Sequence, residues 1–181
     1  MMYNLTVDRP YNHVLKMWQE LLDSFGLVEG QPFAIREAVV GDSLLLDLRQ
    51  EQTDTFDVND VDYLIRAHAW LMILSPMNYT IFHGDKILLL VSIIPTAPGV
   101  AEISFLTDNN LVSASRRVKF TMIKAFKEGL NDLPFRRLQA KVKEGFDVGT
   151  TFVEKLGFLK EGVLNQFGPE GDNYIMYGQV R

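Results

Sequence analysis

The stretch FRRLQAKVKEGFDVGTTFVEKLGFLKEGVLNQFGPEGDNYIMYGQV, residues 135–180, decides the fold of this 181-residue chain. Its first residues alternate apolar and polar side chains, as in a strand with one buried face. Asp147 precedes a stretch with helical spacing, which Gly157 would end. The pattern therefore predicts a strand, a short helix and a closing hairpin, in that order, at residues 135–142, 148–156, 158–167 and 174–180.

Upstream of that stretch, strand and helix patterns alternate only in part. Apolar spacing predicts helices at 11–25, 60–74 and 114–130, and strands at 33–40, 43–48, 79–82, 87–94 and 100–107. A helix is an alternative for 43–48. Residues 87–94 are apolar on both faces, as in a central strand that is covered from both sides. Because hairpins interrupt the alternation, we expect an α/β fold with a mixed central sheet and helices on both faces.

The composition excludes several kinds of site. The chain has no cysteine, which rules out a disulfide framework, a thiolate zinc site and a cysteine nucleophile. Its three histidines lie far apart in the sequence, so we expect no metal site. The formal net charge of −5 argues against a nucleic-acid-binding protein.

The charge is unevenly distributed along the chain. Residues 1–110 carry 6 basic and 15 acidic side chains, whereas residues 111–181 carry 12 basic and 8 acidic ones. A basic C-terminal half could attract a phosphate-bearing cofactor, although a chance difference between solvated faces is an equal alternative. The sequence shows no signal-peptide pattern and no apolar run near the ~20 residues that span a bilayer, so we expect a cytoplasmic protein without a membrane partner.

Residues 135–180 resemble the C-terminal half of the GNAT superfamily of acyl-CoA N-acyltransferases, and most closely its ribosomal-protein N-terminal acetyltransferase group. The likeness is carried by the strand 136–142, by Glu154-Lys155-Leu156-Gly157-Phe158 at the end of the helix, by 160–164 and by the final strand around 174–177. The resemblance implies a GNAT-like domain over 51–181 that binds acetyl-CoA as co-substrate. Residues 1–50 would form an N-terminal extension, a helix plus short strands, that packs on this domain.

In this family the acyl-CoA lies between two splayed parallel strands, and its pyrophosphate binds a glycine-rich loop at a helix N-terminus. Free backbone N–H groups and the helix dipole favour an anion there. The resemblance implies cofactor contacts from Leu106, Asn109, Asn110, Leu111, Val112, Ser113, Ala114 and Ser115. Only Ala114 matches the family motif, and the loop contains no glycine, although Arg116, Arg117 and Lys119 could supply charge. The alternative is an ordinary capped helix, with Ser113 or Ser115 as its N-cap.

Around the last helix the resemblance assigns further positions. Phe146 stands where the family commonly has an asparagine, and Gly149 occupies the position of a small residue; both are expected to contact the cofactor. Val153 replaces the tyrosine that many members use as general acid. A general base must deprotonate the acceptor amine, and Glu102 is the candidate for it. Strand alternation places Glu102, Ser104 and Leu106 on one face.

Two functions remain open from the sequence. The first is an N-acetyltransferase in which a peptide N-terminus, a lysine or a small amine attacks acetyl-CoA directly. The second is a catalytically degenerate GNAT-like binding or structural protein, of the kind found in some tailed phages, whose partner would be a second copy of the chain or another protein. An open cleft at 110–115 would favour the first, and a cleft filled by Val112 or Phe146 would favour the second.

Overall fold

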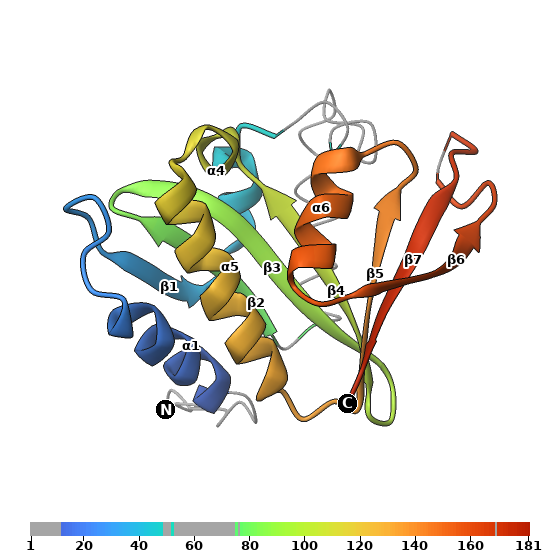
Figure 1. The fold of residues 1–181 in the computed structure, drawn as a ribbon, viewed down its shortest axis with the longest axis horizontal. Helices are drawn as coiled ribbons and strands as arrows, with labels where there is room; N and C mark the ends of the chain where they lie inside the picture. The colour runs from blue at the N-terminus through green and yellow to red at the C-terminus, as the bar shows by residue number, and fades with distance from the viewer. Residues whose placement is uncertain (1–11, 49–51, 53–74, 76, 169) are drawn as a thin grey trace, which may run out of the picture.

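The computed structural model describes residues 12–48, 52, 75, 77–168 and 170–181 of the chain. Within these residues seven strands form one sheet, in the order β1-β2-β3-β4-β5-β7-β6 (Figure 1). The strands are β1 Phe33–Glu37, β2 Met77–His83, β3 Lys86–Ala97, β4 Val100–Thr107, β5 Arg137–Lys143, β6 Leu159–Leu164 and β7 Tyr174–Val180. Neighbouring strands are antiparallel except β4 and β5, which run parallel. The sheet is therefore mixed, as the sequence predicts.

The strand predicted at 87–94 is an interior strand of the sheet, β3. In β3 every residue from Ile87 to Ile93 is buried, because β2 and β4 flank the strand and both of its faces are covered. The positive φ of Gly84, +61°, forms the turn that leads from β2 into β3.

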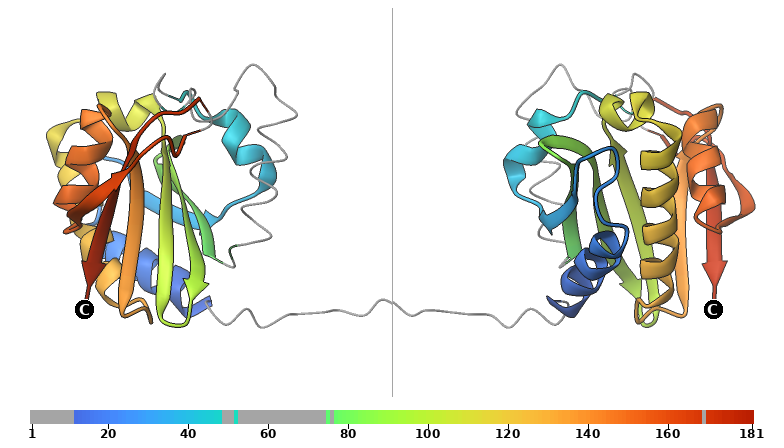
Figure 2. Two further views of the ribbon diagram at one scale, coloured as in Figure 1. Left: turned by 90° about the vertical axis from the view of Figure 1, so that its right-hand side faces the viewer. Right: turned by 60° about the vertical axis from the view of Figure 1, so that its left-hand side comes forward.

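Helices α1 Asn12–Ser24, α5 Arg116–Asn131 and α6 Asp147–Lys155 lie on one face of the sheet (Figure 1). Trp18 of α1 packs between Phe126 of α5 and Tyr79 of β2, with ring centroids at 4.8 and 5.5 Å. The 3-10 helix η1 Val40–Leu45 lies on the opposite side (Figure 2). The apolar core is one continuous cluster from α1 through the sheet to β7.

Residues 43–48 do not form the predicted strand. They belong in part to η1, so the helical alternative is the closer one. The N-cap of α6 is Phe146 rather than Asp147, which is the first helical residue. The helix expected at 60–74 lies outside the described residues.

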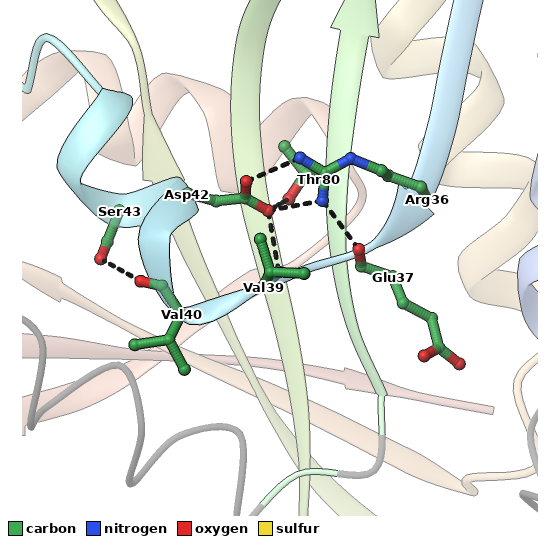
Figure 3. A network of polar contacts seen from close by, with 7 residues as sticks. All are labelled: Arg36, Glu37, Val39, Val40, Asp42, Ser43 and Thr80. Carbon is green, nitrogen blue, oxygen red and sulfur yellow. Dashed lines mark hydrogen bonds and ion pairs between the residues drawn. The ribbon is translucent and has the colours of Figure 1, made fainter.

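The position of η1 is set by a buried carboxylate. The side chain of Asp42, only 1% exposed, accepts hydrogen bonds from both terminal nitrogens of Arg36 at 2.8 and 2.6 Å, from the Val39 N–H at 2.9 Å and from the Thr80 hydroxyl at 2.5 Å (Figure 3). Burial alone would raise the pKa of the Asp42 carboxyl, but the hydrogen bonds from Arg36, Thr80 and Val39 together lower it below its ordinary value. This network joins η1 to β1 and β2, and it directs the following residues toward the end of β4.

Candidate active site

The parallel strands β4 and β5 part soon after they meet. Their pairing consists of Val100–Arg137, Ala101–Leu138 and Glu102–Gln139, although β4 continues to Thr107 and β5 to Lys143. Beyond the last pair the strands enclose a cavity of about 480 Å³. Parallel strands that separate in this way leave backbone groups and side chains of both edges facing one opening.

The floor of the cavity is apolar. Phe105 of β4 packs edge to face on Phe152 of α6 and Phe126 of α5, with centroid distances of 5.1 and 6.1 Å. Val142 and Met122 also line it. Charged side chains complete the lining: they are Glu102, Asp147, Lys119, Lys141, Lys143 and Lys155. The cavity therefore suits a ligand with an apolar part and anionic groups.

The backbone edge of β4 beside the cavity is paired by a side chain. The Asp108 N–H donates to the Leu88 carbonyl of β3 at 2.9 Å, so the preceding residue, Thr107, points its own N–H and C=O toward the opening. There the amide of Gln52, oriented so that donors meet acceptors, accepts from the Thr107 N–H at 3.0 Å and donates to the Thr107 carbonyl at 2.9 Å. Gln52 thus pairs with the strand edge as an extended peptide would.

The segment expected to bind pyrophosphate is a short helix, α4 Asn109–Ser113. Its N-cap is Asp108, 2% exposed, whose carboxylate accepts from the Asn110 N–H at 2.6 Å and the Asp47 N–H at 2.7 Å. The Asn109 N–H donates to the Asp47 carbonyl, and the Leu111 N–H donates to the Asp108 carbonyl. Three donors of the expected anion loop are therefore occupied within the chain, and a carboxylate lies at the helix N-terminus.

Ser115, one of the two N-caps considered, caps α5 by accepting from the Val118 N–H at 3.3 Å, whereas Ser113 lies inside α4. Arg116 and Arg117 are exposed in the first turn of α5. The Lys119 ammonium donates to the Val112 carbonyl at 2.6 Å. Of these three basic residues, Lys119 lines the cavity, and Arg116 and Arg117 lie two to three residues before it at the start of α5.

Phe146 and Val112 line the cavity but leave it open. The Phe146 ring lies against Gly149: a Cβ at this glycine would be 2.5 Å from Cδ1 of Phe146 and 3.1 Å from Cγ1 of Val142. Val153 is buried and faces the cavity as well. A side chain at 149 would therefore push on the Phe146 ring and Val142. Val153, which stands in place of the family's tyrosine, presents only methyl groups to the cavity.

Glu102 lines the cavity next to Lys141. The Glu102 Oε2 lies 2.7 Å from the Lys141 ammonium, and both side chains are 23% exposed. The Lys141 ammonium also stands 4.7 Å from the centroid of the Phe167 ring. The candidate base is thus already ion-paired with a primary amine of the chain itself.

The structure brings part of the expected site together. Residues that line the cavity are Glu102, Leu106, Leu111, Val112, Phe146 and Gly149, whereas Asn109, Asn110, Ser113, Ala114 and Ser115 are not in its lining. Sequence reasoning missed Gln52, Lys141 and Lys143. Lys141 and Lys143 had a signal in the strict alternation of β5, whose polar face they share with Arg137.

No family sequence model matches the chain, and no curated protein sequence is significantly similar to it. Solved structures are similar in fold. A GNAT-family acetyltransferase from Bacillus anthracis superposes with a TM-score of 0.60 at 13% identity, covering 82% of this chain and 94% of the other. The chain has the GNAT acyltransferase fold. The resemblance noted from residues 135–180 is thereby confirmed at the level of the fold.

Further structures with the GNAT fold superpose equally well. Ribosomal-protein-alanine N-acetyltransferase from Brucella melitensis gives a TM-score of 0.58 at 16% identity, with 81% of this chain and 99% of the other covered. Spermidine N-acetyltransferase from Vibrio cholerae, solved with CoA and spermine, gives 0.59 at 12% identity, with 82% and 95% covered. In the described part of the chain, no helix has the length and apolarity needed to cross a membrane, and no group of acidic and histidine side chains could hold a metal ion.

Proposed function

We propose that the chain is an N-acetyltransferase that transfers an acetyl group from acetyl-CoA to a primary amine. The observation that carries the proposal is the parting of β4 and β5 after Glu102, which opens a cavity with an apolar floor and basic side chains around it. An extended thioester arm fits such a slot, and its phosphates suit the basic end. The acceptor class is a peptide N-terminus, a lysine or a small amine.

The phosphates must be held differently from the expected glycine loop. Because Asp108 and Asp47 already occupy the donors at Asn109–Leu111, we assign phosphate binding to the α5 end of the connection. There Arg116 and Arg117 are exposed and Lys119 lines the cavity. Side-chain charges replace backbone donors in this arrangement, so the affinity for CoA is expected to fall as salt increases.

In the reaction the acceptor amine attacks the thioester carbonyl carbon, and the bond from that carbon to sulfur breaks. Glu102 accepts a proton from the amine, since it faces the cavity at the point where the strands part. Gln52 occupies the Thr107 N–H, so the oxyanion is stabilised by the Phe105 N–H, which alternation turns toward the same side. The leaving thiolate must draw its proton from solvent, because Val153 offers none.

The test combines binding with turnover. Isothermal titration should give a micromolar Kd for acetyl-CoA, and a thiol reagent should detect CoA release on addition of spermine or an N-terminal peptide. The chain has no cysteine, so every thiol that appears comes from CoA. Glu102→Gln should lower turnover at least ~100-fold while leaving Kd within a few-fold, whereas Glu128→Gln on the exposed face of α5 should change neither. Absence of binding at millimolar acetyl-CoA would overturn the proposal.

A second candidate is a GNAT-fold protein without catalysis. It is favoured by the Asp108 carboxylate at the N-terminus of α4, where it would oppose a pyrophosphate. This candidate predicts no thiol release with any amine. Release that depends on Glu102 would eliminate it.

A further inference from the structure

We propose that Lys141 is itself an acetyl acceptor, so that the protein acetylates its own cleft. The inference rests on the proposed function, because it needs acetyl-CoA in the cavity. It concerns a modification site, and it assigns a chemical role to the ion pair between Lys141 and Glu102.

Lys141 stands where the acceptor amine of an acyl transfer has to be. Glu102 and Gln139 are the last paired residues of β4 and β5, so Lys141 follows directly after the strands part. Its ammonium lies 2.7 Å from the Glu102 carboxylate, and both side chains line the cavity. A primary amine in contact with a carboxylate beside a bound thioester is the arrangement that direct aminolysis requires.

The Phe167 ring restricts where the Lys141 side chain can go. Phe167 belongs to the connection between β6 and β7, and the centroid of its ring lies 4.7 Å from the Lys141 ammonium. Glu102 of β4 forms an ion pair with the same ammonium. With both contacts the amine is held beside the cavity rather than in solvent. A nucleophile fixed in this way reacts at an effective concentration far above that of a free amine.

The step balances without any further reactant. The Lys141 nitrogen forms a bond to the acetyl carbonyl carbon, and the bond from that carbon to sulfur breaks. Of the two protons that the ammonium loses, one passes to Glu102 and on to solvent, and the other ends on the thiolate. The products are N-acetyl-Lys141 and CoA thiol, with one proton released.

Lys143 provides a matched internal comparison. It lies on the same face of β5, lines the same cavity, has a 20% exposed side chain and is ion-paired with Asp172 at 3.0 Å. Its carboxylate partner comes from the β6–β7 connection and not from the strand edge where β4 and β5 part. If closeness to the cofactor alone caused acetylation, Lys143 would react as Lys141 does.

The experiment uses the intact protein with isotopically labelled acetyl-CoA, followed over time by mass spectrometry. Cleavage after glutamate gives one peptide, residues 129–144, that carries both Lys141 and Lys143, and fragmentation separates the two sites. Lys124, 50% exposed and on α5, reports spontaneous acetylation. We expect label at Lys141 with a rate independent of protein concentration, and at least ~100-fold slower labelling in Glu102→Gln. Asp172→Asn, the matched control, should leave the Lys141 rate unchanged.

Equal labelling of Lys141 and Lys143, or a Lys141 rate that Glu102→Gln does not change, would overturn the inference. The thiol assay with a free amine tests the proposed function independently of Lys141. Turnover of the free amine without label on Lys141 overturns the inference alone, whereas failure of acetyl-CoA to bind overturns both.

Discussion

The buried carboxylate of Asp42 should carry a large part of the stability of the η1 region. In Asp42→Asn the shape is kept, but one oxygen becomes an NH₂ group that cannot accept from Arg36. At least one charge-assisted hydrogen bond is lost, and the others, from Thr80 and Val39, become neutral. Hydrogen bonds to charged groups are worth about 1.5–3 kcal/mol each, so we expect a loss of about 3 kcal/mol in the free energy of unfolding. For a domain of this size that corresponds to a fall in Tm of roughly 6–12 °C.

The stability difference between wild type and Asp42→Asn should depend on pH in a defined direction. The pKa of Asp42 is lower in the folded protein than its ordinary value of 3.8, so the unfolded chain binds more protons around that pH. The stabilisation is therefore complete above the unfolded pKa and is lost as the pH falls through the folded one. Urea unfolding of wild type and Asp42→Asn should show a gap that is constant near neutral pH and shrinks below about pH 4.

Asp23→Asn is the control, because Asp23 is an exposed carboxylate that, among the described residues, accepts a side-chain hydrogen bond from the Gln19 amide alone. Its stability should match that of the wild type within ~0.5 kcal/mol. A loss below ~1 kcal/mol in Asp42→Asn at neutral pH would refute the reasoning, and so would a gap that persists unchanged in acid.

Two further variants test the cleft. Gln52→Ala frees the N–H and C=O of Thr107 for the amides of the pantetheine arm. The Kd for acetyl-CoA measured by titration should therefore fall about tenfold, as one net hydrogen bond would give. An unchanged or higher Kd would contradict this competition between Gln52 and the cofactor. Gly149→Ala places a methyl group against the Phe146 ring and Val142, and should cost about 1–3 kcal/mol in urea unfolding. Adding Phe146→Ala should cost less in the Gly149→Ala background than alone, and strict additivity would contradict the contact.

Local periodicity was sufficient for most elements. The buried run of β3 and the helical spacing of α5 depend on residues close in sequence, so their patterns survive without knowledge of the fold. The prediction of a strand at 43–48 was wrong because a tertiary contact determines the conformation of this segment. The preceding residue, Asp42, is bound by Arg36 and by Thr80, which is 38 residues away. Nothing in residues 43–48 indicates that Asp42 is buried and ion-paired with Arg36.

The candidate site was harder to predict because it depends on which strands are neighbours. The ion pair between Glu102 and Lys141 requires β4 to lie beside β5 with Glu102 opposite Gln139. Once that register is given, alternation alone puts Lys141 next to the carboxylate. The sequence supplied both residues and the alternation, but only the sheet topology brings them together.

The cleft and the anion loop, the two parts of the site, respond differently to sequence change. The cleft arises from the course of β4 and β5, so many apolar side chains can line it without closing it. An anion loop, in contrast, depends on backbone N–H groups that no neighbour occupies. Here Asp108 follows β4 directly and caps α4, so it takes the Asn110 N–H that a phosphate would need. The chain therefore keeps the cleft of the GNAT fold although the backbone donors at 109–111 are occupied, and for this reason we propose phosphate contacts from Arg116, Arg117 and Lys119 instead.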